Sequence, residues 1–240
     1  MKAMILSDLF NMRQALVQMA WVCVVISFVV SFVSQSPIAG TAAAAAMASM
    51  SFIFGVAAYD EAGGWGAFRM TMPLSRNQVV AGRYASTLVV CMLSFCFALV
   101  VSALVLAVAQ LCSGMIDAAA VMVQEFFSTS GMWLALVASA LLAVSVMLFA
   151  SAFATPMIMR YGLTTTTRIA PALFVVVVAV IMVVGGELID SGTLEIAPLV
   201  ELLASPASVL GLTMGVFALA LVCMGISALV ARRFYATREF

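Results

Sequence analysis

Six long apolar runs divide this chain into candidate membrane crossings joined by short polar connections. A helix needs about 20 predominantly apolar residues to span the hydrocarbon core of a bilayer, and each run is close to that length or longer. Composition agrees, because 66% of the 240 residues are hydrophobic and 8% are charged, against about 25% charged in a soluble domain. The sequence therefore predicts an all-α, polytopic membrane protein with six transmembrane helices in a single domain, residues 1–240.

The expected spans share a high apolar content and lack charge near their centres. They cover roughly residues 15–34, 38–58, 84–112, 132–155, 169–186 and 208–231. Residues 1–13 are expected to form an amphipathic helix on the inner leaflet. Between Ser113 and Gly131, aromatic and aliphatic residues alternate with acidic ones, which predicts a short interfacial helix.

The distribution of charge predicts the orientation. With six spans and both termini in the cytoplasm, all ten basic residues fall on the cytoplasmic side: Lys2, Arg13, Arg69, Arg76, Arg83, Arg160, Arg168, Arg232, Arg233 and Arg238. The outer loops contain no Lys or Arg and carry Asp117, Glu125, Glu187, Asp190, Glu195 and Glu201. Because the bias in Lys and Arg decides topology, the span count and the orientation support each other.

Residues 60–83 form the longest polar interruption. Trp65 and Phe68 lie at helical spacing beside Arg69, and Pro73 ends that pattern. Aromatic side chains between charges are unusual in a plain connector. We weigh two interpretations, a surface contacted by a soluble partner and a solvated connector with interfacial anchors, and favour the first.

A new helix is predicted from Arg76. The pattern Ser75-x-x-Gln78 is a capping box, and nothing interrupts the helical pattern before about Cys112. Such a helix is roughly 55 Å long, whereas the hydrocarbon core is about 30 Å thick. Its first turns are therefore expected to stand in the cytoplasm.

Small and polar residues inside the spans are interpreted first as packing residues. Gly40 and Ala42–Ala46 allow close helix contact, and a dimer interface or a substrate path is the alternative. The five cysteines are interpreted as apolar packing residues, and no metal site is predicted. The buried hydroxyls are expected to bond back to their own helices; they belong to Ser27, Ser94, Ser102, Ser139 and Ser145.

The sequence lacks the residues that several classes of function require. The chain has no histidine, and no charged residue lies near the middle of a predicted span, where proton relays and ion-coupled carriers place one. No G-x-x-x-x-G-K-[ST] phosphate loop occurs. We therefore do not expect an enzyme, and any ATP must be bound by another chain.

The central loop resembles that of a known family. The residues in question are Tyr59-Asp60-Glu61, Trp65, Met72-Pro73-Leu74-Ser75-Arg76, Val79-Val80 and Arg83-Tyr84. Their order is similar to the cytoplasmic loop of membrane subunits of type-2 ABC exporters, especially a compact bacterial six-span branch related to antibiotic and peptide export permeases. Weaker similarities follow at Pro156 with Arg160-Tyr161-Gly162 and Arg168, and in the segment from Ser227 to Phe240. A run of threonines, Thr164–Thr167, departs from the family pattern.

This resemblance implies a permease subunit in the cytoplasmic membrane of a bacterium, with the type-2 ABC exporter permease fold. Its partners would be an ABC ATPase subunit that holds ATP and Mg, a second permease copy or paralogue, and the lipid bilayer, with no nucleic acid and no cofactor on this chain. The coupling residues would be Asp60, Glu61, Trp65, Phe68, Arg69, Pro73, Ser75 and Arg76. Arg160, Tyr161 and Arg168 would form a second cytoplasmic loop, and residues 187–207 an external helical segment.

The cargo is predicted only by class. Eighteen methionines suit an adaptable apolar wall, which favours an amphipathic peptide or a lipophilic molecule, and the resemblance implies an antibiotic as a further candidate. Two alternatives remain open at this stage. One is a membrane scaffold or immunity subunit that moves no cargo, and the other is a secondary carrier.

Overall fold

The computed structural model describes residues 13–62, 76–162, 166, 183 and 205–236. Within these ranges the chain is helical and has no strand. The helices are α2 (Arg13–Val33), α3 (Pro37–Ala62), α5 (Arg76–Cys112), α6 (Asp117–Ser128), α7 (Met132–Tyr161) and α10 (Pro206–Ala236). Five of them, all except α6, are long and apolar enough to cross a membrane. The chain is therefore a multi-pass, all-helical membrane protein, while the predicted span at 169–186 lies outside the described residues.

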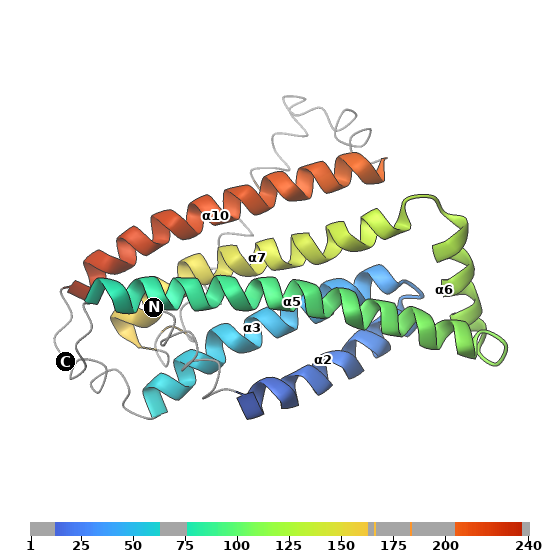
Figure 1. Cartoon of the computed structure of the whole chain (residues 1–240), viewed down its shortest axis with the longest axis horizontal. Helices are drawn as coiled ribbons and strands as arrows, with labels where there is room; N and C mark the ends of the chain where they lie inside the picture. Colours follow the sequence, from blue (N-terminus) through green and yellow to red (C-terminus); the bar gives the residue numbers. More distant parts are fainter. Residues whose placement is uncertain (1–12, 63–75, 163–165, 167–182, 184–204, 237–240) are drawn as a thin grey trace.

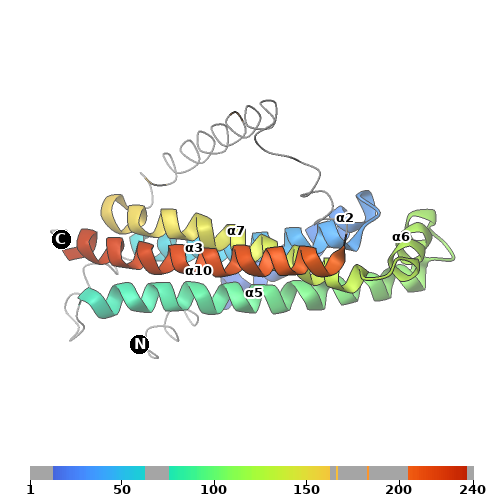
Figure 2. The ribbon, with the colours of Figure 1, turned by 90° about the horizontal axis from the view of Figure 1, so that it is seen from above.

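The five long helices lie side by side along one axis, and α6 stands across one end of the bundle (Figure 1). The view at right angles shows the same alignment (Figure 2). Helices α2, α3, α5 and α7 alternate in direction, whereas α10 runs the same way as α7 (Figure 1). The chain therefore changes ends of the bundle between Gly162 and Ser205.

The two ends of the bundle differ in charge. At one end α5 begins and α3, α7 and α10 finish, and α2 begins on the same side but farther in (Figure 1). Every Arg in the described ranges lies at or near this basic end: Arg13, Arg76, Arg83, Arg160, Arg232 and Arg233. The opposite, acidic end carries α6 with Asp117 and Glu125. Arginines far apart in sequence thus lie toward one end, as the Lys and Arg pattern predicts, together with Asp60 and Glu61 in the last turn of α3.

Helices α2 and α3 form a tight hairpin. Helix α2 ends at Val33 and α3 begins at Pro37, with Gln35 between them at φ 52°. A Cβ on Gly40 would lie 2.6 Å from the carbonyl oxygen of Ser27, and the Ser27 hydroxyl donates to the Gly40 carbonyl at 2.9 Å. The small residue at Gly40 therefore packs two helices of the same protomer.

The hydroxyl groups behave in more than one way. Ser145 donates to Leu141 in its own helix, which confirms the expected pattern, and Ser139 bonds both Leu136 of α7 and Ile38 of α3. The prediction for Ser27 is wrong, because its hydroxyl reaches the neighbouring helix. Ser102 Oγ is buried with no hydrogen-bond partner among the described residues. Hydroxyl groups here thus bond to neighbouring helices as well as to carbonyls of their own helix.

The main core lies between α3, α5, α7 and α10 and contains many small side chains. Its fully buried members include Ala44, Val80, Ala98, Val144 and Ala220. Along α10 the buried positions Thr213, Ala220, Met224, Ser227 and Ala231 fit steps of three and four residues, the spacing of a coiled-coil seam. Packing in lipid depends on such close contact rather than on the hydrophobic effect.

Several helix bounds differ from the expected ones. The helix predicted from Arg76 to Cys112 is confirmed as α5, and the short helix expected after Ser113 is α6. The expected loop at 60–83 is wrong at its start, because α3 continues to Ala62 and includes Asp60 and Glu61. Pro156, Arg160 and Tyr161 lie inside α7 rather than in a loop. In a membrane bundle, neighbouring helices can satisfy the carbonyl that a proline frees, so the helix continues.

Candidate functional site

The predicted coupling residues lie between α3 and α5 in the chain. Asp60 and Glu61 are in the last turn of α3 and Arg76 is the first residue of α5, with only their backbones described. Trp65, Phe68, Arg69, Pro73 and Ser75 lie outside the described residues. The structure therefore defines the two helices that a force on this segment would reach first.

Both flanking helices are anchored close to the basic end. Val79 and Val80, the fourth and fifth residues of α5, are 3% and 0% exposed and belong to the main core. Phe52 and Val56 of α3 pack with Val90 of α5 in a second cluster. The start of α5 is thus buried against the protein, and a displacement of the segment before it would pass into the packed core.

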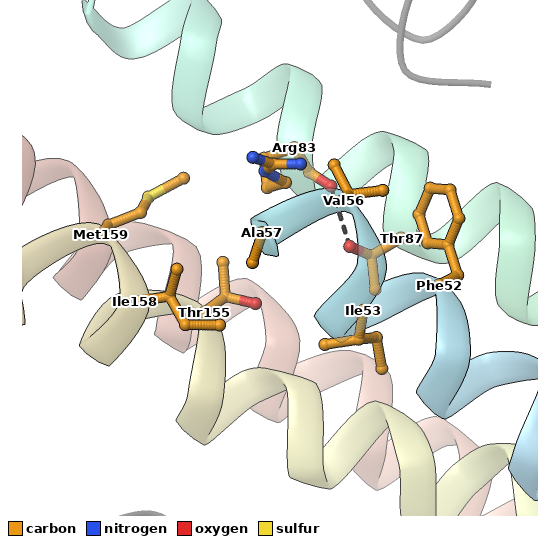
Figure 3. Close-up of a pocket in the computed structure, with 9 residues that line it drawn as sticks. All are labelled: Phe52, Ile53, Val56, Ala57, Arg83, Thr87, Thr155, Ile158 and Met159. Atoms are coloured by element: carbon orange, nitrogen blue, oxygen red, sulfur yellow. Dashed lines mark hydrogen bonds between the residues drawn. The ribbon is translucent and has the colours of Figure 1, made fainter. Parts of the chain in front are cut away.

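A cavity of about 40 Å³ lies at the basic end between α3, α5 and α7. Helix α3 contributes Phe52, Ile53, Val56 and Ala57, α7 contributes Thr155, Ile158 and Met159, and α5 contributes Arg83 and Thr87 (Figure 3). The Thr87 hydroxyl donates to the Arg83 carbonyl at 3.0 Å. Such a volume can hold water but is far below the several hundred Å³ of a ligand site. The cavity is a gap where three helices meet, not a cargo site.

On the other face of α5, a buried chain of hydrogen bonds joins three helices. The hydroxyl oxygens of Tyr84 on α5 and Ser227 on α10 are 2.7 Å apart, and the Ser227 hydroxyl donates to the carbonyl of Ala152 on α7. Each of the two hydroxyl-bearing residues is 8% exposed. Arg83 and Tyr84 are adjacent in sequence, so one turn of α5 contacts α3 and α7 on one side and α10 on the other.

Of the predicted second cytoplasmic loop, the structure describes mainly the residues at the end of α7. The Arg160 guanidinium lies 4.8 Å from the ring centroid of Phe234 on α10 and 5.1 Å from that of Tyr161. Arg168 lies outside the described residues. Of the threonine run, the described Thr166 is buried and donates to the Gly162 carbonyl at 2.7 Å. Arg160 therefore joins the last turns of α7 and α10 by cation–π contact.

Comparison with known proteins decides the family. A family model described as ABC-2 family transporter protein matches residues 3–236. The chain belongs to the ABC-2 transporter family. No curated protein and no solved structure matches it.

Membership in the ABC-2 family confirms the resemblance carried by the central loop and gives a transporter permease subunit in a membrane. The family also implies a partner subunit that binds ATP. The basic end of this ABC-2 subunit, with the α3 and α5 ends, the Arg83 cavity and the Tyr84 hydrogen bonds, is the candidate functional site.

Sequence reasoning on this ABC-2 subunit missed the roles of Tyr84, Ser227 and Ala152. Tyr84 and Ser227 appear in the resemblance without a function, and Ala152 does not appear. One signal was available, since Pro156 lies four residues after Ala152 and a proline in a helix leaves that carbonyl without its donor. The residue that replaces the donor lies 75 positions away in the chain and has no local signal.

Proposed function

We propose that this ABC-2 subunit is the permease half of an ATP-driven exporter in the cytoplasmic membrane of a bacterium, with its basic end in the cytoplasm. Two observations support this topology. The described Arg residues lie at or toward the basic end, as the positive-inside rule predicts for a cytoplasmic face. The chain changes ends between Gly162 and Ser205, which suits a sixth span at 169–186 with both termini in the cytoplasm.

The coupling element of this proposal is the segment 60–83. A separate ATPase subunit, which holds ATP and Mg, binds this segment and moves it as the nucleotide is hydrolysed. The observation that carries the proposal is the burial of Val79 and Val80, which lie where segment 60–83 enters α5. A displacement of the segment therefore shifts the packed core, because this part of α5 is buried rather than free.

The remaining partners follow from the outer surface. Helices α2 and α10 expose apolar faces that include Trp21, Val25, Ile226 and Leu229, and such faces suit lipid or a second permease copy. The cargo proposed is an amphipathic peptide, an antibiotic or a lipophilic molecule. The proposed interfacial helix at 1–13 and external segment at 187–207 lie almost wholly outside the described residues.

Reconstitution in vesicles with the partner ATPase tests this function. Trp65→Ala and Arg76→Glu should abolish nucleotide-dependent movement of cargo while membrane insertion is unchanged. Matched controls are Trp133→Ala, at the acidic end, and Arg13→Glu, at the basic end on α2. Both controls should transport normally.

Other outcomes of this experiment would indicate a different mechanism or a different function. Normal transport by both test variants would show that segment 60–83 does not transmit the force. A wild-type complex that binds its ATPase and moves nothing would indicate a scaffold or immunity subunit. Transport driven by an ion gradient without nucleotide would indicate a secondary carrier.

A further inference from the structure

Helix α7 contains a proline where it approaches the basic end. Pro156 is buried and lies inside the helix, which continues to Tyr161. Proline has no N–H, so the Ala152 carbonyl, four residues earlier, has no donor from its own helix. In a membrane helix such a carbonyl must be satisfied by a neighbouring group.

The donor comes from α10, and it is itself held by α5. The Ser227 hydroxyl donates to the Ala152 carbonyl. A serine hydroxyl has one proton, so in the contact at 2.7 Å between Tyr84 and Ser227 the Tyr84 hydroxyl is the donor. The result is a directed chain from Tyr84 to Ser227 to Ala152, which we name the three-helix relay.

The surroundings of Pro156 differ on its two sides. Toward α10, Ser151 contacts the Met224 sulfur at 3.3 Å, one step along from Ala152. Toward α3, the neighbours Thr155, Ile158 and Met159 line the cavity of about 40 Å³ (Figure 3). The part of α7 around the proline thus contacts α10 through hydrogen bonds on one side and borders the cavity on the side of α3.

We propose that Tyr84 and Ser227 are positioning residues for transport, which hold the turn of α7 at Pro156 and couple it to α5. This rests on the proposed function, in which force enters through segment 60–83. Tyr84 lies eight residues after Arg76, roughly 12 Å along the helix. When α5 moves, the Tyr84 donor leaves Ser227, and the end of α7 turns toward the cavity.

A polar relay suits this role better than an apolar contact. The seams between α5, α7 and α10 consist mainly of small and aliphatic residues. A buried polar contact fixes register in such seams. Because the relay includes the carbonyl freed by Pro156, it fixes the position at which α7 is weakest.

The first test compares Tyr84→Phe with wild type in vesicles that contain the ATPase. The variant loses one hydroxyl and keeps the ring. The cargo moved per ATP hydrolysed should fall about fivefold, the size of one net hydrogen bond, while the hydrolysis rate and the amount of folded complex stay the same. Ser145→Ala is the matched control, because its hydroxyl bonds only within α7. A merely structural role would lower hydrolysis and transport together, and that result would overturn the proposal.

A second test uses thermal stability and needs no transport. Pro156→Ala supplies an N–H to the Ala152 carbonyl, so Ser227→Ala should lower the melting temperature less in that background than in wild type. Tyr84→Phe and Ser227→Ala should not be additive. Equal losses in both backgrounds, or full additivity, would refute the relay. If wild type fails to transport, the proposed function fails, and the stability cycle still decides whether the relay positions the Pro156 turn.

Discussion

The two ends of the helical bundle are built by different means. At the acidic end, α6 packs by Ala119, Met122 and Phe126, and the Phe126 ring meets Trp133 edge-on at a centroid distance of 4.7 Å. At the basic end, α5, α7 and α10 meet through the three-helix relay and lie beside a cavity. At the basic end the relay fixes the register of the helices, while the cavity leaves space into which the end of α7 can turn. The difference indicates a fixed acidic end and a movable basic end.

The starts of α7 and α10 show how the acidic end is fixed. Gly131 precedes α7 at φ 86°, and a Cβ there would lie 2.6 Å from the Pro206 Cγ at the start of α10. Ser205 caps α10, because its hydroxyl oxygen accepts from the Ser208 N–H at 3.2 Å. Proline at the first helical position has the required φ and no donor to satisfy. These features bring the starts of α7 and α10 into close contact.

The largest effect is expected for Gly131→Val. The variant would place a β-branched side chain at a positive φ and against Pro206, which should lower the free energy of unfolding by about 3 kcal/mol. Unfolding in a denaturing detergent measures this loss. Gly114→Val is the control, because a Cβ at Gly114 has no neighbour within 4 Å. Equal losses in both variants would remove the evidence for a tightly fixed acidic end.

Gly40→Ala should have the next largest effect. Its Cβ would lie 1.9 Å from the Ser31 Oγ, which can rotate, and 2.6 Å from the Ser27 carbonyl oxygen, which cannot. We expect a loss of about 2 kcal/mol in the free energy of unfolding. Gly225→Ala, on α10 with no neighbour near its Cβ, should be close to neutral. A neutral Gly40→Ala would show that the α2 and α3 hairpin is looser than described.

Filling the cavity at the basic end should raise stability and lower activity. Ala57→Val adds two methyl groups toward the space of about 40 Å³, and cavity filling commonly adds about 1 kcal/mol. If the end of α7 uses this space, nucleotide-dependent transport should fall while the melting temperature rises. Unchanged transport in a stabilised variant would contradict a movable basic end.

The smallest effect is expected for Arg160→Gln. This variant removes a cation–π contact at an exposed position and should lower the free energy of unfolding by about 0.5 kcal/mol. Phe234→Leu should cost a similar amount. The double variant should cost little more than either change alone if the two side chains act on each other. Full additivity would show that Arg160 does not join α7 to α10.

The sequence predicts the parts of the fold that depend on local signals. The start of α5 at Arg76 follows from the cap that precedes it, and α6 follows from its alternating apolar pattern. The helical state of Asp60 and Glu61 was missed, because acidic residues after an apolar run signal the end of a span and say little about the end of a helix. Helix α3 continues to Ala62.

The candidate site was predictable only in part. Arg76 and Arg83 were placed at one end by the distribution of charge, and the structure agrees. Pro156 was placed just after the end of a span at 155, because it and Arg160-Tyr161-Gly162 resemble a loop of the family. Here Ser227 supplies the missing donor from another helix, and that contact depends on tertiary packing.

The most direct test of the central claim is a photo-crosslinking measurement at the two ends of the bundle. A photoreactive amino acid replaces Trp65 in one variant and Trp133 in another, each in the complete complex. Crosslinks are expected from position 65 to the ATPase subunit, with a yield that changes when nucleotide is bound, and none is expected from position 133. Crosslinks from position 133 to the ATPase, or none from position 65 in any nucleotide state, would contradict coupling at the basic end.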